Sequence, residues 1–339
     1  LRDYPSVTQG EVPQGVDLAQ IDANQRDLLE RQATHSKDTD ALMNVVGELR
    51  GLVTAMPSKL LPEAVASIHQ QSLDVARDLL KQHKPGQALA LLEKQRPILW
   101  PNATGPLKAT FLCRLASAKH ALGLDSEAWE LFIEARQYNP DDEKVMSSVA
   151  VGHLLLGQRK EAATAARLVL ARNPLNFQAQ AILVQSCDEP LERIIDALPA
   201  ECRTNAEVAA AIGFVARQNG DLTAAKEWFR TALSADSDAS PDIKGMLGEL
   251  IVNGHTGNPT SSVRIGQLND TTRSEIEGAL SLLKEACDSI EDDNALRPRV
   301  TWLLNAAVAA RILDRPAEAE EYLTRARRVA PDDLAVIYQ

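Results

Sequence analysis

The fold is decided by two consecutive stretches of 34 residues, ATFLCRLASAKHALGLDSEAWELFIEARQYNPDD at 109–142 and EKVMSSVAVGHLLLGQRKEAATAARLVLARNPLN at 143–176. An Asn-Pro pair stands near the end of each, at Pro140 and at Pro174. Aligned on these pairs, the stretches share small, large apolar, Gly and Pro positions: Leu112, Leu115, Ala116, Gly123, Ala128, Phe132, Ala135 and Pro140 in the first, and Met146, Val149, Ala150, Gly157, Ala162, Ala166, Val169 and Pro174 in the second. Such a period indicates a fold built from one repeated element.

The same pattern recurs along the chain. Residues 206–239 and 300–333 match it at Ala209, Ile212, Gly213, Gly220, Ala225, Phe229 and Ala232, and at Leu303, Ala306, Ala307, Ala319, Leu323, Ala326 and Pro331. Weaker matches fill the gaps at 69–102, at 177–205, where a short second helix follows Pro190, and at 240–299, with helices expected around 246–252 and 275–290. We therefore expect about seven helix pairs over residues 57–339, with an insertion at 253–269.

Each repeat reads as two helices separated by a turn. The turn falls near the fifteenth residue, where Gly123, Gly157 and Gly220 stand, and in the repeat at 69–102 we expect it at Pro85-Gly86. Small residues at offsets 8, 20 and 27 let the two helices approach closely, and larger ones at offsets 4, 7 and 24 fill the space between pairs. Pro at offset 32 ends the second helix.

This pattern closely resembles the tetratricopeptide repeat, whose period is also 34 residues. The resemblance covers about residues 67–333 and implies an all-α, right-handed α-solenoid of stacked helix pairs. The family often has Gly at offset 8 and Tyr at offset 11, whereas here only Gly213 supplies the Gly and the Tyr is missing. The fold expectation stands, because Ala can replace Gly at a close helix contact.

Composition agrees with a helical fold. Of 339 residues, 45% are hydrophobic and only 4% aromatic, which favours close-packed helices rich in Ala and Leu. With 36 Lys and Arg against 47 Asp and Glu, the net charge is −11. We therefore expect no binding of nucleic acid or of anionic membranes, both of which need a basic face. No stretch of 18 apolar residues predicts a transmembrane helix.

The N-terminal region differs from the repeats. Residues 1–16 read as irregular, and residues 17–56 predict a long helix. A heptad frame fits residues 18–53, with seam positions at Leu18, Gln25, Gln32, Thr39, Val46 and Val53, and at Ile21, Leu28, His35, Leu42 and Leu49. One interpretation is a coiled coil that forms a homodimer or connects to an upstream domain, and the other is a helix lying against the first repeat. Because the chain starts at Leu1 and ends in an apparent helix start, we expect a segment of a longer protein.

Catalytic motifs are missing from the sequence. It has no phosphate-binding loop, no dinucleotide-binding glycine turn, no zinc-protease helix and no nucleophile elbow. The cysteines form no CxxC pair and lie at no zinc-ligand spacing: Cys113, Cys187, Cys202 and Cys287. We interpret them as small buried side chains in a reducing cytoplasm, with a redox pair of Cys187 and Cys202 as the alternative. We therefore expect a cytoplasmic, bacterial-type protein that is not an enzyme and uses no cofactor or metal.

The resemblance also implies a binding surface. The first helix of each pair lines a concave groove, and the family's groove offsets fall here on Arg77, Lys81, Thr110, Ser117, His120, Lys144, Phe214, Arg217, Gln218, Thr301 and Arg311. Several are cationic, which predicts an acidic or extended peptide partner, and the other interpretation is an ordinary solvated helix face. We expect a non-catalytic scaffold that binds a protein or peptide. The alternative is the sensor or regulatory region of a larger signalling or defence protein whose effector domain precedes Leu1.

Overall fold

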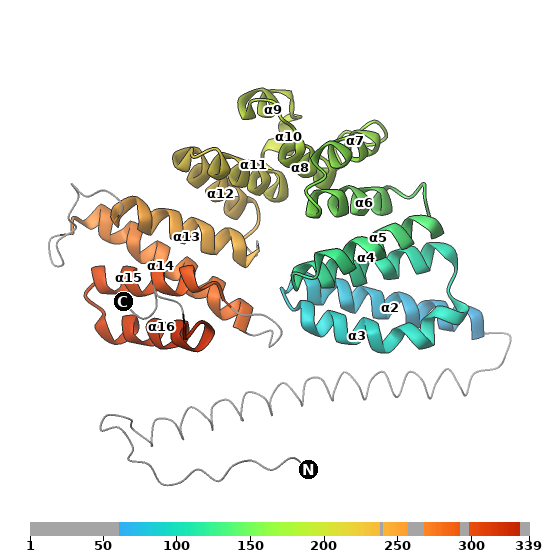
Figure 1. Cartoon of the computed structure of the whole chain (residues 1–339), viewed down its shortest axis with the longest axis horizontal. Helices are drawn as coiled ribbons and strands as arrows, with labels where there is room; N and C mark the ends of the chain where they lie inside the picture. The colour runs from blue at the N-terminus through green and yellow to red at the C-terminus, as the bar shows by residue number, and fades with distance from the viewer. Residues whose placement is uncertain (1–60, 238–239, 257–267, 292–297, 333–339) are drawn as a thin grey trace, which may run out of the picture. The chain divides into compact units, whose positions relative to one another are not determined.

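The computed structural model describes residues 61–237, 240–256, 268–291 and 298–332, and the regular elements in these ranges are helices, with no strand among them (Figure 1). The chain divides into two parts, residues 1–68 and 69–339, and the fold given below is that of the second part together with the start of α2 at Leu61. The predicted irregular segment at 1–16 and the predicted long helix or coiled coil at 17–56 lie outside the described residues.

The helices follow one another in pairs, as the repeat pattern predicts (Figure 1). The pairs are α2 (Leu61–Lys81) with α3 (Pro85–Leu99), α4 (Gly105–Ala121) with α5 (Asp125–Tyr138), α6 (Glu143–Leu155) with α7 (Arg159–Leu170), α8 (Phe177–Ser186) with α9 (Leu191–Ala197), α11 (Ala206–Gln218) with α12 (Leu222–Ala235), α13 (Pro241–Thr256) with α14 (Asp270–Glu291), and α15 (Val300–Ile312) with α16 (Pro316–Val329). A 3-10 turn η1 (Trp100–Asn102) follows α3, and a one-turn helix α10 (Ala200–Arg203) follows α9.

The turn within a pair has the same backbone in five pairs. Gly123, Gly157 and Gly220 have φ of 77°, 69° and 84°, in the left-handed region where glycine has no steric cost. The residue after each donates its N–H to a carbonyl five residues back, at 2.9 Å, which is the Schellman pattern that ends a helix. The predicted glycine turns are therefore confirmed.

Two of these five turns use other residues. His83 and Asp314 take φ of 58° and 59° at the same offset. The following N–H groups, of Lys84 and Arg315, donate to carbonyls five residues back at the same 2.9 Å. The expected turn at Pro85-Gly86 is thus wrong by two residues. Pro85 is instead the first residue of α3, where its missing N–H and fixed φ suit a helix start.

Small residues lie where the paired helices approach most closely. The offset-20 alanines are at most 2% exposed: Ala88, Ala128, Ala162, Ala225 and Ala319. The contact of α13 with the next pair also requires glycine, since a Cβ on Gly245 would lie 2.4 Å from the Cε2 atom of the buried Trp302 indole of α15. This packing confirms the role that the sequence predicts for small side chains.

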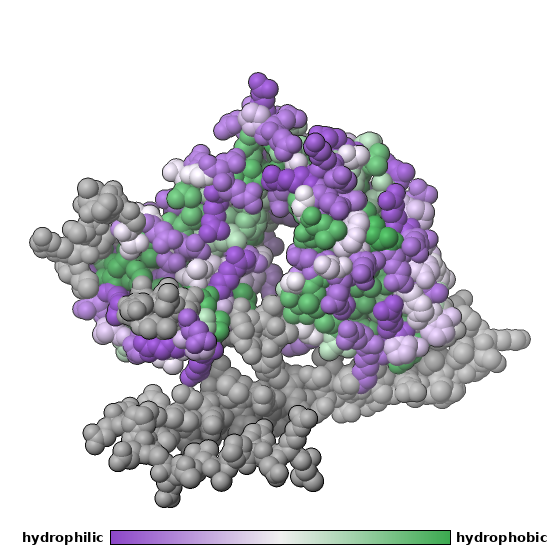
Figure 2. Space-filling view, in the orientation of Figure 1, coloured by the Kyte–Doolittle hydropathy of each residue, from purple (hydrophilic) through white to green (hydrophobic). Residues whose placement is uncertain are grey.

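The core of the repeats is divided into successive clusters. A large one runs from Leu73 to Val149, and the largest runs from Ala209 to Ala326. Two smaller clusters lie between them, one joining α6, α7 and α8 and one joining α8, α9, α10 and α11. On the face shown in Figure 2, hydrophilic and hydrophobic surface alternate over these helices.

Repeat boundaries are held by side-chain caps. The Asp142 carboxylate accepts the N–H of Val145 at 3.0 Å and so caps the start of α6. Glu143 joins that boundary to the next one, because its Oε1 accepts from the Asn173 and Asn176 amides at 2.8 and 2.6 Å. These two hydrogen bonds lower the pKa of the Glu143 carboxyl.

The predicted insertion begins later than expected. Residues 253–256 belong to α13, which continues to Thr256. His255 Nε2 lies 2.9 Å from Glu275 Oε2 of α14, a contact that holds this last turn. At the other side, Asn269 caps α14 by accepting the N–H of Thr272 at 2.7 Å. Residues 257–267 lie outside the described ranges.

Candidate functional site

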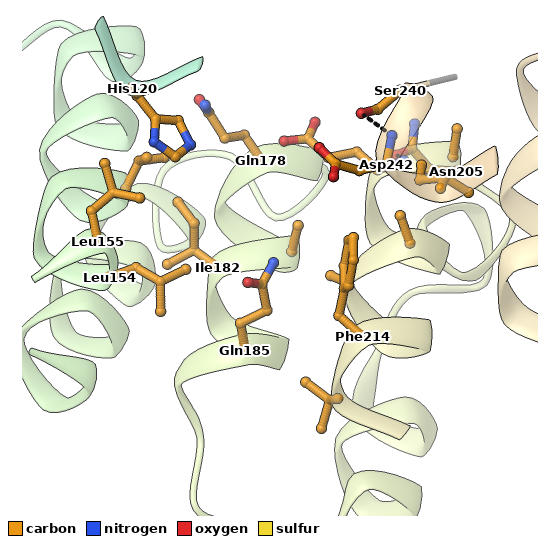
Figure 3. A pocket seen from close by; sticks show the side chains of 18 of the residues that line it. His120, Leu154, Leu155, Gln178, Ile182, Gln185, Asn205, Phe214, Ser240 and Asp242 are labelled. Carbon is orange, nitrogen blue, oxygen red and sulfur yellow. Dashed lines mark hydrogen bonds between the residues drawn. The ribbon is translucent and has the colours of Figure 1, made fainter. Parts of the chain in front are cut away.

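The second part of the chain contains a cavity of about 1170 Å³ (Figure 3). It is lined mainly by residues of α6, α8, α11 and the start of α13, with His120 from the end of α4 and Arg159 from the start of α7. Cavities that hold small molecules are about 300–1,000 Å³. This one therefore has room for a ligand larger than a typical small molecule.

Apolar side chains form part of the wall. Leu154 and Leu155 of α6 lie to one side of Ile182 of α8, and Phe214 of α11 lies to the other (Figure 3). Phe214 is half-buried and meets the buried Phe229 ring edge-on, with centroids 5.2 Å apart and planes at 74°. The Phe214 ring is thus held from behind while it still borders the cavity.

Primary amides form the polar part of the wall. Gln178 and Gln185 stand on either side of Ile182 on α8 (Figure 3). Seven residues apart, they share one helix face at a separation of about 10.5 Å along the axis. Asn205 uses its Oδ1 to cap α11, accepting the N–H groups of Glu207 and Val208 at 3.0 and 3.3 Å. Its amino group remains as a donor, and each glutamine amide can both donate and accept.

The charged residues of the wall are mostly acidic. Glu207, Asp236 and Asp242 contribute carboxylates, against the guanidinium of Arg159 and the imidazole of His120. Asp242 is neutralised by Arg299, whose Nη2 donates to Oδ1 at 2.7 Å. Glu207, in the first turn of α11, has a raised pKa because the surrounding protein replaces part of the water around its carboxyl group.

Three of the predicted groove residues line this cavity, namely His120, Phe214 and Gln218. His120 Nδ1 lies 2.8 Å from Asp125 Oδ1, so its ring is oriented by a partner on α5. Whether these side chains contact a ligand stays a prediction.

The other predicted groove residues lie outside the cavity, and several have partners within the protein. Arg217 donates to Glu249 at 2.9 Å, and Arg77 lies 3.1 Å from both Asp74 and Asp78. The side-chain hydroxyls of Ser117 and Thr110 each donate to the backbone carbonyl four residues earlier, at 2.9 and 3.0 Å. The remaining residues are exposed on their helices: Lys81, Lys144, Thr301 and Arg311. The cavity is therefore not the cationic groove that the sequence predicts.

Some cavity residues were missed by the sequence interpretation. Gln178 and Gln185 stand at offsets 2 and 9 of the shortened repeat at 177–205, and Glu207 at offset 2 of the next. These are groove offsets of the family, the same as those of Lys144 at offset 2 and Ser117 at offset 9. Applying them to the shortened repeat would have found both glutamines, but its poor fit to the pattern hid the signal.

No cluster of three or more His, Cys, Asp or Glu side chains that could hold a metal occurs among the described residues. None of the four cysteines forms a disulfide within the described ranges, and burial raises the pKa of Cys113 to about 11, which disfavours its reactive thiolate. In the described ranges no helix has the length and apolar character needed to cross a membrane.

Repeated helix pairs with a shared turn, close alanine contacts and a lined cavity define a helical-repeat scaffold. Residues 206–238 match the family model of the tetratricopeptide repeat. Other helix pairs of the chain have the same left-handed turn and the same buried small residues as this matched pair. The chain therefore contains a tetratricopeptide repeat at residues 206–238.

Known proteins resemble the chain only in part. It is 26% identical over 253 residues to Cellulose synthase operon protein C of Pseudomonas fluorescens (strain SBW25), a match that covers 70% of this chain and 19% of that protein. The chain thus spans about a fifth of the length of that relative. Among solved structures, Cut9-Hcn1 of the APC/C has a TM-score of 0.45 at 14% identity, covering 79% of this chain and 54% of that chain. The pilF protein of Pseudomonas aeruginosa has a TM-score of 0.37 at 14% identity, covering 81% and 97%.

Proposed function

We propose that this chain is a scaffold that binds an extended segment of another protein in the cavity between α6, α8, α11 and α13. The observation that carries the proposal is the wall itself, in which apolar Phe214 and Ile182 alternate with the amides of Gln178 and Gln185. An extended peptide presents backbone N–H and C=O groups that need partners, and primary amides supply both kinds. The apolar side chains would bury the peptide's own side chains.

Peptide display against the purified chain tests this proposal. We expect selected peptides to bind the wild-type protein and to lose about tenfold in affinity, about 1.4 kcal/mol, on Phe214→Ala or Gln185→Ala. Matched controls are Phe177→Ala and Gln137→Ala, which replace exposed residues outside the cavity. Peptides that bind the Phe214→Ala and Gln185→Ala variants as well as the wild type would refute the assignment, and so would a display that yields no binder.

A second candidate comes from the match to Cellulose synthase operon protein C. The match covers less than a fifth of that protein, so in this reading the chain is an internal scaffold of a larger protein that serves cellulose production. Deleting the gene in its host and measuring extracellular cellulose tests the idea, and unchanged cellulose would exclude it. The sensor interpretation, the cytoplasmic location, the absence of catalysis and a homodimer through residues 18–53 also stay predictions.

A further inference from the structure

We propose that the cavity selects extended segments that carry a Lys or Arg side chain, with the Glu207 carboxylate as the anchor for that cation. The inference rests on the peptide-binding function proposed above and specifies its partner. It differs from the acidic partner expected from the sequence, because none of the Lys and Arg residues expected along the groove lines this cavity.

The wall carries the cation Arg159 at the start of α7, and the charges at the start of α11 support a cationic ligand group at Glu207. Asp242 is already bound by Arg299 at 2.7 Å, and His120 is bound by Asp125 at 2.8 Å. In the described part of the chain, no Lys, Arg or His side chain forms an ion pair with Glu207. An incoming cation would therefore meet a carboxylate that has no competing partner there.

The surroundings of Glu207 make such a pair effective. Its side chain is accessible to solvent, yet the protein around it displaces enough water to raise the pKa of the carboxyl group. A carboxylate with reduced solvation gains more from an ammonium or guanidinium group than one in open water, because the local dielectric screening is weaker. Its position in the first turn of α11 keeps the negative charge favourable toward the helix dipole.

The spacing of the wall residues suggests a ligand pattern. Glu207 and Phe214 are seven residues apart on α11, so they share a face at about 10.5 Å, the same spacing as Gln178 and Gln185 on the neighbouring α8. Between them, α11 contributes only Ala210 and Ala211 to the wall, and these small side chains leave room for a backbone. In a polyproline-II conformation, residues i and i+3 point the same way about 9.3 Å apart. A Lys or Arg three residues from a large apolar residue would match both anchors.

Three degenerate libraries of 12-residue peptides, identical except for a fixed central Lys, Gln or Glu, test the inference. Retention on the immobilised protein is quantified by mass spectrometry for the wild type, for Glu207→Gln and for Glu192→Gln, an exposed matched control on α9 outside the cavity. We expect the Lys library to be retained about tenfold more than the Glu library, and only Glu207→Gln to abolish this preference. Circular dichroism spectra that match the wild type verify that the variants fold.

The outcomes separate the two proposals. If the wild-type protein retains the Gln library and the Phe214→Ala variant does not, peptide binding is supported, whatever the charge preference is. Equal retention of the Lys and Glu libraries, or a Lys preference that survives Glu207→Gln, overturns the inference and leaves the binding proposal standing. Retention of none of the libraries defeats both. Cellohexaose that binds in a Glu207-dependent way without any preference for Lys would overturn the inference in favour of a sugar site.

Discussion

Gly245 in α13 offers the sharpest test of the packing described above. A Cβ at this position would lie 2.4, 2.6 and 2.7 Å from the Cε2, Cδ2 and Cζ2 atoms of Trp302. The indole is fully buried, so it cannot swing away into solvent. Overpacking of this kind costs about 1–3 kcal/mol, while replacing Gly by Ala in a helix interior gains about 1 kcal/mol. We expect Gly245→Ala to destabilise the protein by up to about 2 kcal/mol.

A matched control removes the helix-propensity effect. Gly278 is exposed within α14, and a Cβ there would meet nothing within 4 Å. Gly278→Ala should therefore stabilise the protein by about 1 kcal/mol. The two variants should differ by about 1–3 kcal/mol, which at about 2–4 °C per kcal/mol separates their thermal midpoints by several degrees.

Urea unfolding followed by far-UV circular dichroism measures both variants. The cause is checked by Gly245→Ala combined with Trp302→Phe, since the smaller ring leaves space for the new methyl group. The double variant should lose less stability than the sum of the single changes, because contacting residues couple. Strict additivity, or a Gly245→Ala protein as stable as Gly278→Ala, would refute the reasoning.

Three further predictions test other parts of the fold. Glu143→Gln should lower the free energy of unfolding at neutral pH but not in acid. Hydrogen bonds lower the pKa of Glu143 in the folded protein. The stabilisation by its carboxylate is therefore fully present above the ordinary pKa of 4.5 and is lost as the pH falls through the lowered pKa. Urea midpoints that stay apart in acid would contradict this. Gly220→Ala should lower the free energy of unfolding by about 1 kcal/mol because φ is 84° at this position. Asp314→Gly should leave stability nearly unchanged because Asp tolerates the left-handed region. Equal shifts of the thermal midpoint in the two variants would count against the turn geometry. Cys113, with its pKa raised from 9.0 to about 11, should react with iodoacetamide about a hundredfold more slowly in the native protein than in urea, and similar rates would show that the thiol is not shielded.

Much of the fold could be predicted because the repeat is encoded locally. The glycine at Gly123 indicates a turn, and the small side chain of Ala128 indicates a close helix contact. Short-range sequence patterns are therefore enough to predict both features. His83 and Asp314 adopt the same turn without the glycine signal, since the helix before them ends with the same hydrogen bonds. Pattern reading therefore placed the first of these turns two residues too late.

The candidate site could be predicted only in part. Offsets identify Phe214 as a groove residue, but they cannot show that Arg217 is bound by Glu249, which is 32 residues further along the chain. A charge counted from sequence alone is therefore not a charge available to a ligand. The acidic character of the cavity also depends on Asp236 and Asp242, which come from the end of one helix and the start of another.

The division of the core into clusters has a consequence for how the protein unfolds. The two large clusters should melt as separate cooperative blocks, with the smaller clusters around α8 as the weakest junction, because a repeat array is stabilised mainly by contacts between neighbours. The cavity draws its wall from both sides of that junction. A bound segment would then stabilise this junction. It would slow hydrogen exchange in α8 and α11 and make the two blocks unfold together.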